Sequence, residues 1–563
     1  MAAPARPVIE TRYEQMFPTL EPADVDRLRR FGERRAYGAR ERLVATGEIS
    51  AGMFVVLTGE VAITQHNALG RDEAIITHGP GAFIGELSQL SGRPSLVDAH
   101  AVKPVEALVI PPRRLRDVLV AEAELGERIM RALILRRVGL LQSGVAGPLI
   151  IGHAGQGDVL RLAGFLTRNG HPHHTLDPDS DSCAKTLLER FSVAPSELPI
   201  VLCPNGQMLR NPSEVELARC IGLVRPIDPS KVYDAAIIGA GPAGLAAAVY
   251  AASEGLSVIV LDCRAFGGQA GASARIENYM GFPTGISGMA LMARAYNQAE
   301  KFGAEMAIPD EVVRLRCRPA GADARFELRL ASDERVNARA VVIASGARYR
   351  RLDAPNLAEF EASSIHYWAS PLEGKLCAGQ EVVLVGAGNS AGQAVVYLAS
   401  QVTKVWLLVR GRSLEASMSR YLVDRIAALP NVQVLAQTEV AALEGQGGML
   451  EAVRWRHLPS GEETRRPIRH LFLFIGADPN TAWLSQSDVA LDDKGFVRTG
   501  ADLGNGRRPL ETSRQGVFAI GDVRAGSVKR VAAAVGEGAQ VVATLHAFLA
   551  EAAVIGNIGR TNG

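Results

Sequence analysis

Two glycine-rich turns in the second half of the chain have the spacing of nucleotide-binding loops. In the first, Gly239, Gly241 and Gly244 stand between the apolar run 233–238 and the alanine-rich segment 245–248. Gly239 permits a tight turn, Gly241 lets the backbone approach a pyrophosphate, and Gly244 lets the following helix pack against the strand. The N-terminus of that helix offers N–H groups to the pyrophosphate. The segment therefore predicts a dinucleotide site.

An acidic residue follows at the place where the ribose of a dinucleotide is expected. The apolar run 256–261 ends in Asp262, which lies 23 residues (262 − 239) beyond Gly239. A carboxylate at this position accepts hydrogen bonds from ribose hydroxyls. The strand context and the acid together make the first turn a strong signal.

The second copy of the pattern differs at the ribose position. Gly386, Gly388, Ser390 and Ala391 follow the apolar run 380–385. The next apolar run, 404–409, is followed by Arg410 and Arg412 instead of an acid. Guanidinium groups there suit the 2′-phosphate of NADPH. We therefore expect FAD at the first turn and NADPH at the second; the alternative is that both arginines are only solvated at a strand end.

The order of further motifs resembles that of the low-molecular-weight thioredoxin reductases, from about residue 232 to 549. Apolar runs 340–344 and 471–475 end in glycine turns and bracket the second copy as an insertion, and the run 516–521 ends in Asp522. The resemblance implies that Gly268, Gln269 and the segment 277–279 with Asn278 line the flavin. It also implies that Asp522 holds the ribityl chain, that Arg530 and Val531 contact the flavin rings, and that the protein is a homodimer.

The redox-active cysteines of that family are missing. Where its members carry Cys-Ala-Thr-Cys, residues 369–372 read Ala-Ser-Pro-Leu, and Cys377 has no partner close in sequence. We expect hydride transfer from NADPH to FAD. The reduced flavin then delivers electrons to an unidentified acceptor: an external disulfide or thioredoxin, a quinone, a one-electron carrier or oxygen. Two alternatives stay open, namely a thioredoxin–disulfide reductase that recruits thiols such as Cys203 or Cys377, and a non-catalytic sensor that signals through the N-terminal domain. No catalytic residue is assigned.

The N-terminal region predicts a small β-barrel closed by helices. Short apolar runs at 53–57, 61–64, 74–76 and 107–110 are separated by glycines, and a helical period begins at Leu115. The region resembles the cyclic-nucleotide-binding domain in 54–61, in Gly85-Glu86-Leu87 and in Pro94. The resemblance implies that Glu86 binds a ribose hydroxyl and that an arginine after the proline pairs with the cyclic phosphate. Ser95 stands at that position, so Arg93, on the other side of Pro94, would have to replace the missing arginine at the phosphate. A degenerate site is therefore favoured over a working cAMP site.

Residues 147–223 alternate between strands and helices and resemble the thioredoxin or glutaredoxin fold. Pro199 leads directly into the apolar run 200–202, as the cis-proline of that fold does. The loop 152–157 lacks the Cys-x-x-Cys pair, so we expect a docking or spacer element without thiol exchange. The histidines of this region have no ligand partners at suitable spacing and are expected to be solvated in loops, not bound to metal: His153, His171, His173 and His174.

The whole chain of 563 residues thus predicts a multidomain α/β protein in which one Rossmann-like domain is inserted in another. The expected boundaries are 1–145 for the cyclic-nucleotide-binding-like β-barrel, 146–226 for the thioredoxin-like domain, 230–348 with 477–563 for FAD and 349–476 for NADPH. The net charge of +1 predicts no nucleic-acid partner. The six cysteines show no metal spacing. The absence of a signal peptide in 1–17, and an apolar stretch of only 245–252, predict a cytoplasmic protein without a membrane span.

Overall fold

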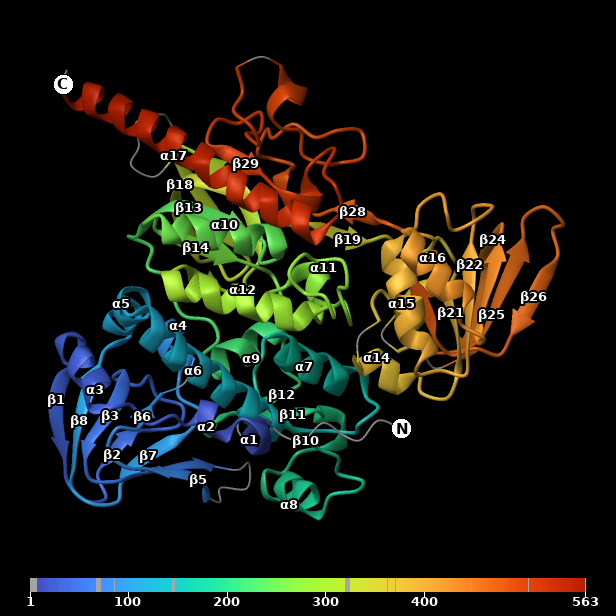
Figure 1. Cartoon of the computed structure of the whole chain (residues 1–563). Coiled ribbons are helices and arrows are strands. Elements are labelled where there is room, and N and C mark those ends of the chain that lie inside the picture. The colour runs from blue at the N-terminus through green and yellow to red at the C-terminus, as the bar shows by residue number, and fades with distance from the viewer. Residues whose placement is uncertain are drawn as a thin grey trace.

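A computed structural model describes residues 8–66, 72–85, 87–143, 147–318, 325–361, 363–369, 371–446, 448–504 and 506–561. Glu86 and Ser370 lie outside these residues. Figure 1 shows the barrel at the lower left, a small α/β unit beside it, a large central sheet above both, and a second sheet to the right.

The N-terminal unit is a barrel of two four-stranded sheets, with strand orders β1-β8-β3-β6 and β2-β7-β4-β5. The apolar runs that predicted strands all lie in strands. Alternate residues such as Phe54 and Val56 are buried inside the barrel. The strands are β1 (Glu33–Tyr37), β2 (Arg42–Val44), β3 (Met53–Thr58), β4 (Val61–His66), β5 (Asp72–His78), β6 (Phe83–Ile84), β7 (Asp98–Ala101) and β8 (Val105–Ile110).

Helices close one side of this barrel. The predicted helical period appears as two consecutive helices that bury Leu115, Leu119, Ile129 and Leu133 against the barrel. The helices are α1 (Val8–Thr11), α2 (Tyr13–Met16), α3 (Pro22–Leu28), α4 (Ser88–Ser91), α5 (Pro112–Ala121) and α6 (Ala123–Ser143).

The small α/β unit has a four-stranded sheet of order β10-β9-β11-β12. β9 and β10 are parallel, and β11 is antiparallel to β9 and β12. The Leu198–Pro199 bond is cis, and a Cβ on Gly152 would lie 3.0 Å from Cβ of Pro199, so the proline faces the loop after β9. The elements are β9 (Leu149–Ile151), α7 (Gly157–Arg168), β10 (His174–Leu176), α8 (Ser182–Arg190), β11 (Ile200–Leu202), β12 (Met208–Arg210) and α9 (Glu214–Cys220).

The first dinucleotide fold is built on a sheet of order β15-β14-β13-β18-β17-β16, with β29 beside β18. β15, β14, β13, β18 and β29 are parallel, whereas β16 and β17 form an antiparallel extension. The strands are β13 (Val232–Ile238), β14 (Val258–Leu261), β15 (Glu305–Ala307), β16 (Val312–Cys317), β17 (Phe326–Leu330), β18 (Arg335–Ile343) and β29 (Val517–Ala519), and the helices are α10 (Pro242–Ser253), α11 (Gly268–Gly271), α12 (Gly288–Phe302) and α17 (Val531–Thr561).

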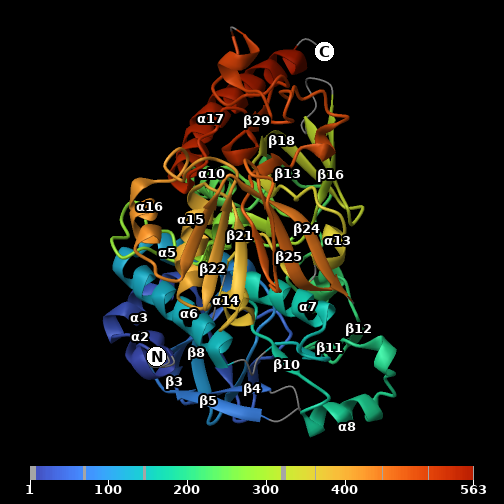
Figure 2. The same cartoon turned by 90° about the vertical axis from the view of Figure 1, so that its right-hand side faces the viewer.

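The second dinucleotide fold is joined to the first by two antiparallel strands, β19 (Ala347–Tyr349) and β28 (Ala477–Pro479). Its parallel sheet has the order β20-β27-β21-β22-β23. Helices cover one face and a three-stranded antiparallel sheet covers the other, as Figure 2 shows. The elements are α13 (Leu357–Phe360), β20 (Ile365–His366), α14 (Pro371–Leu376), β21 (Glu381–Val385), α15 (Asn389–Ala399), β22 (Lys404–Val409), α16 (Arg420–Ala427), β23 (Val432–Ala436), β24 (Thr438–Gln446), β25 (Met449–His457), β26 (Glu463–Arg466) and β27 (Leu471–Leu473).

One helix corrects the expectation about apolar segments. Within α17, the segment Val531–Ala552 is long and apolar enough to cross a membrane by length and composition. The stretch 245–252 is therefore not the longest apolar segment of the chain, contrary to the expectation from the sequence. The core helix of a folded domain passes the same test. Val541, Leu545 and Phe548 are buried in the first dinucleotide fold. A Cβ on Gly538 would lie 2.7 Å from the carbonyl oxygen of Ala243 in α10, so the two helices approach closely.

Candidate functional site

The first glycine turn has the geometry that close packing of a helix on a strand requires. Gly239 has a φ of +113°, in the region that favours glycine. A Cβ on Gly244 would lie 1.9 Å from the carbonyl oxygen of Gly239, so only glycine fits there. Gly241 caps α10, and a Cβ on it would meet only Cα of Gly268, at 3.9 Å. The N-terminus of α10 therefore has room for a ligand beside its free N–H groups.

Asp262 lies at the end of β14, beside the same turn. Its carboxylate accepts hydrogen bonds from the backbone N–H groups of Ala240 (2.9 Å), Arg264 (3.1 Å) and Ala265 (3.3 Å). Burial raises the pKa of Asp262, and these hydrogen bonds oppose the rise. A carboxylate offers about four acceptor positions, so roughly one remains for a ribose hydroxyl. Asp262 thus holds the turn in place, and its contact with a ribose stays a prediction.

Other predicted flavin residues converge on this turn. A Cβ on Gly268 would lie 3.1 Å from Cα of Gly241, and the Gln269 amide donates to the carbonyl oxygen of Ala347. Burial and the nearby Asp522 carboxylate raise the pKa of Tyr349 to about 12. Because glycines 241 and 268 leave a cradle that side chains would fill, the site fits a dinucleotide such as FAD.

Three predicted contacts lie on exposed segments. Asn278 is exposed, and Met280 in the same loop is 92% exposed. Its neighbour Glu277 pairs with Arg425 of α16 at 2.7 Å, which ties the loop to the second dinucleotide fold. Arg530 is exposed, and Val531 begins α17. Contact of these residues with a flavin stays a prediction.

The second turn repeats the geometry of the first. Gly386 directly follows β21 and has a φ of +150°, and a Cβ on it would lie 2.6 Å from the carbonyl oxygen of Phe474. Gly388 caps α15, and a Cβ there would meet nothing within 4 Å. Ser390 is exposed and Ala391 is buried against the strand. The open N-terminus of α15 is therefore the place for a second pyrophosphate.

Arg410 and Arg412 lie where the ribose of a second dinucleotide would be. β21 and β22 are adjacent and parallel, so both arginines follow the carboxyl edge that carries the second turn. Both side chains are exposed, and within the described residues neither is in an ion pair. Two such guanidinium groups fit the 2′-phosphate of NADPH.

The segment that would carry redox cysteines contains none, and the nearby thiol is inert. Burial raises the pKa of the fully buried Cys377 to about 12. Its sulfur lies near His366 and His470, with the donor atoms of all three within 4.8 Å of one another. The two imidazoles face each other, Nε2 to Nδ1, at 3.0 Å, and burial lowers the pKa of His366 to about 3. Because reactivity requires a thiolate, a protonated thiol beside neutral imidazoles does not exchange disulfides.

The structure contains a disulfide that no sequence motif indicates. Cys203, after β11, bonds to Cys220, the last residue of α9, across a separation of 17 residues. Cys203 is buried, whereas Cys183, Cys263 and Cys317 are free and exposed. The spacing in sequence matches no motif, because the pair forms only when α9 packs on the sheet.

Two expectations about histidines were wrong. His171 is buried, Nδ1 lies 2.9 Å from the carbonyl oxygen of Pro172, and burial lowers its pKa to about 3. His153 does have carboxylates beside it, because the Asp179 and Asp177 oxygens lie 3.0 and 3.7 Å from Nδ1. These acids follow the next strand and reach His153 only in the folded sheet.

The cyclic-nucleotide-like cassette also differs from expectation. Glu86 lies outside the described residues. Ser95 is buried and donates to the carbonyl oxygen of Val97 (2.8 Å). Arg93 bonds to Tyr296 on α12. A guanidinium that the sequence did not reveal, that of buried Arg136 on α6, donates to the carbonyl oxygens of Phe83 (3.0 Å) and Gly85 (2.9 Å).

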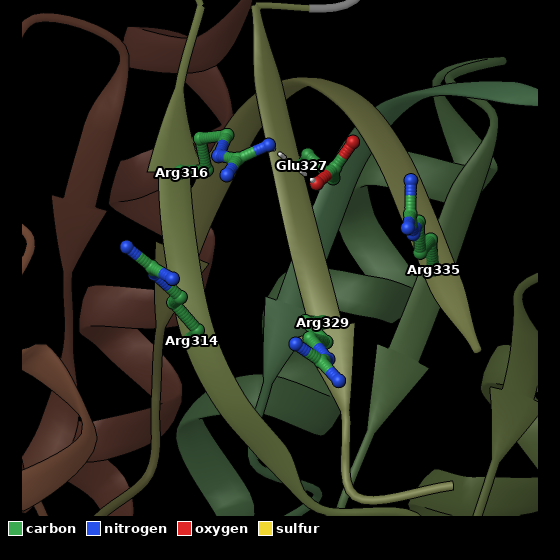
Figure 3. Close-up of a pocket in the computed structure, with 5 residues that line it drawn as sticks. All are labelled: Arg314, Arg316, Glu327, Arg329 and Arg335. Atoms are coloured by element: carbon green, nitrogen blue, oxygen red, sulfur yellow. Dashed lines mark ion pairs between the residues drawn. The ribbon is translucent and has the colours of Figure 1, made fainter. Parts of the chain in front are cut away.

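A group of arginines lies on the antiparallel extension of the central sheet (Figure 3). Arg314 and Arg335 both lie opposite Arg329 in the strand register, and Arg316 lies opposite Glu327. Glu327 pairs with Arg318 at 2.6 Å, and Asp333 pairs with Arg329 at 2.6 Å. The group is a partly neutralised surface network that belongs to neither dinucleotide turn.

Two dinucleotide folds, one inserted in the other, with the glycine turns facing open helix N-termini, define an FAD-dependent NAD(P)H oxidoreductase. The family model of pyridine nucleotide-disulphide oxidoreductases matches residues 233–538, more than half of the chain, and the chain belongs to that family. The model of the cyclic nucleotide-binding domain matches residues 34–122, so the N-terminal barrel is such a domain. FAD and NADPH are the cofactors of this class.

Similar proteins are thioredoxin reductases. NADPH-dependent thioredoxin reductase 3 of Arabidopsis thaliana is 34% identical over 328 residues, which is 56% of this chain but only 58% of the plant protein. Thioredoxin reductase of Mycolicibacterium smegmatis is 32% identical over 57% of this chain and 97% of its own length. The solved thioredoxin reductases of T. acidophilum and of Lactococcus lactis in its FR conformation are 28% and 27% identical, each with a TM-score of 0.52 over 99% of their chains.

Proposed function

We propose that this chain oxidises NADPH with its FAD and delivers the electrons to an acceptor other than a disulfide of the second dinucleotide fold. The observation that carries this proposal is the chemistry at 369–377, where no described residue offers a reactive thiol. Ala369 is buried and the Cys377 thiol stays protonated at neutral pH.

The chain's own residues bind and orient the cofactors. FAD, when bound, supplies the hydride-accepting and electron-delivering chemistry. The N-terminus of α10 and Asp262 hold its pyrophosphate and ribose, while Arg410 and Arg412 select a 2′-phosphorylated nucleotide at α15. NADPH gives up one hydride, which carries two electrons, and becomes NADP⁺. An external acceptor then removes two electrons to complete the cycle.

The small α/β unit supports the second step as a thioredoxin-like docking domain whose loop after β9 lacks the Cys-x-x-Cys pair. Its strand order and the position of Pro199 against the Gly152 loop are the supporting features. Arg168, at the end of α7, lies 4.4 Å from the ring centroid of Trp368, directly before the segment 369–372. The unit therefore contacts the second dinucleotide fold at the place where relatives of this class would keep their cysteines.

A second candidate is a thiol–disulfide reductase that uses Cys203–Cys220 as the first acceptor. The disulfide itself is the observation in favour. In that reaction two electrons and two protons would convert the disulfide into two thiols. Anaerobic titration with NADPH distinguishes the candidates, because wild type would then consume two equivalents, and the double variant Cys203→Ser/Cys220→Ser only one. Equal consumption by both proteins would eliminate the disulfide.

We test the first proposal by anaerobic mixing of the FAD-loaded full chain with NADPH and, separately, NADH. We expect rapid bleaching of the visible flavin band with NADPH and slower bleaching with NADH. A quinone, oxygen, ferricyanide and oxidised thioredoxin then compete as acceptors for the reduced protein. No bleaching with either nucleotide would refute the proposal.

We propose in addition that the protein is a cytoplasmic homodimer, as the resemblance to thioredoxin reductases implies. Light scattering on the eluting full chain is expected to give twice the monomer mass. A monomer mass at every concentration tested would contradict the dimer.

A further inference from the structure

The segment that follows the cyclic-nucleotide cassette is bonded to the first dinucleotide fold. Arg93 stands two residues beyond α4, and its guanidinium bonds to the Tyr296 hydroxyl of α12, 203 residues away in sequence. Its Cζ lies 5.5 Å from the centroid of the Tyr296 ring. One turn along α12, Glu300 is 4% exposed; burial raises the pKa of its carboxyl group, and the positive charge of Arg93 opposes the rise. We call Arg93, Tyr296 and Glu300 the Arg93 junction.

The junction is tightly enclosed on the side of the linker to the first dinucleotide fold. A Cβ on Gly92 would lie 2.0 Å from Nη2 of Arg225, and a Cβ on Gly222 would lie 2.5 Å from Cγ of Pro94. Arg116 of α5 donates to the carbonyl oxygen of Leu90 at 2.6 Å. Because packed interfaces switch between discrete arrangements and do not deform continuously, α4 cannot shift without moving Arg93.

The other side of Tyr296 contacts the flavin loop. The rings of Tyr296 and Phe266 lie 4.6 Å apart, centroid to centroid. Phe266 directly precedes Gly267, and a Cβ on Gly267 would lie 3.2 Å from Cβ of Met292, also on α12. Gly268 and Gln269 follow at once. α12 therefore has the cassette helix on one side and the predicted flavin residues on the other, as Figure 1 shows for α4, α12 and α11.

We propose that the N-terminal domain controls FAD binding in the first dinucleotide fold through the Arg93 junction. A ligand of the cyclic-nucleotide class that binds the N-terminal domain and moves α4 shifts Tyr296, and with it the Phe266–Gln269 loop. The effect is reciprocal, because a loop position that FAD favours also favours one position of α4. The inference rests on the assignment of FAD to the turn at Gly239–Gly244.

The test measures the dissociation constant of FAD from the flavin-stripped full chain. Arg93→Ala removes the bond and the cation, and Tyr296→Phe removes only the hydroxyl and keeps the ring against Phe266. The matched control is Arg128→Ala, which breaks a half-buried ion pair with Asp24 (2.6 Å) inside the N-terminal domain and has no contact with α12. The thermal unfolding midpoint of each flavin-free protein separates loss of fold from loss of coupling.

We expect both junction variants to weaken FAD binding by about tenfold, within the range of allosteric couplings, whereas the control lowers only the unfolding midpoint. Amide exchange supplies a second readout: FAD is expected to slow exchange in 87–93 of wild type and not of Arg93→Ala. Junction variants that bind FAD within about twofold of wild type would overturn the inference. Wild type that binds no FAD at all would instead overturn the proposed function.

Discussion

Replacing Gly244 by alanine tests the first dinucleotide turn at its tightest point. The change adds one methyl group and no charge. In an ordinary helix it would be favourable, because alanine exceeds glycine in helix propensity by about 0.8–1.0 kcal/mol. Gly244 lies in α10, where the added Cβ would be 1.9 Å from the carbonyl oxygen of Gly239.

The magnitude follows from that distance. Real Cβ contacts are not shorter than 3.0 Å, so α10 and the turn must separate by about 1.1 Å. Overpacking of this kind costs about 1–3 kcal/mol, and the gain in helix propensity offsets roughly 1 kcal/mol of it. The net effect on folding is thus between zero and about 2 kcal/mol of destabilisation. FAD binding should suffer more, because the backbone N–H groups of Gly241 and Ala243, at the N-terminus of α10, are displaced with the helix.

The assay combines urea unfolding of the flavin-free protein with titration by FAD. Gly164→Ala is the matched control, because Gly164 lies within α7 and its Cβ would meet nothing within 4 Å. We expect Gly164→Ala to stabilise by up to about 1 kcal/mol and to bind FAD normally, whereas Gly244→Ala binds FAD at least about tenfold more weakly. Wild-type affinity in Gly244→Ala would refute the assignment of this turn to FAD.

Three further predictions concern specificity, pH and charge. Arg410→Ala combined with Arg412→Ala should lower the ratio of kcat/KM for NADPH to that for NADH by about tenfold or more, and steady-state kinetics that give an unchanged ratio would contradict the 2′-phosphate role. His171 stays neutral in the folded chain because burial lowers its pKa from 6.5 to about 3. As the pH falls below 6.5, this histidine is protonated only in the unfolded chain, so the stability of the fold should fall progressively until about pH 3. The slope is about 1.4 kcal/mol per pH unit, and urea unfolding of His171→Gln should show a correspondingly weaker dependence on pH. Arg314→Glu should stabilise the fold by about 0.2–1 kcal/mol in thermal unfolding, because position 314 faces Arg329. Arg316→Glu should destabilise the fold, because position 316 faces Glu327. A change of the same sign in both variants would refute the cross-strand argument.

The elements that carry the dinucleotide sites could be predicted from the sequence because their causes are local. Gly239 and Gly386 need a backbone conformation that other residues avoid, and each stands between a short apolar run and an alanine-rich helix. The barrel strands β3, β4, β5 and β8 likewise follow from short apolar runs between glycines, whereas β1, β2, β6 and β7 were not predicted. The cis conformation of Pro199 was implied only by the resemblance to the thioredoxin or glutaredoxin fold.

Tertiary structure decided the partners of individual side chains. Nothing near Arg93 in the sequence indicates that it contacts Tyr296 on a different domain, and nothing near Cys203 indicates Cys220. His171 stands between Gly170 and Pro172, a turn-like setting that predicts exposure, yet its side chain is buried in the folded chain. Periodicity and spacing report only what lies within a few residues along the chain. Contacts between domains depend on how whole elements pack, and that packing joins the N-terminal barrel to the flavin loop.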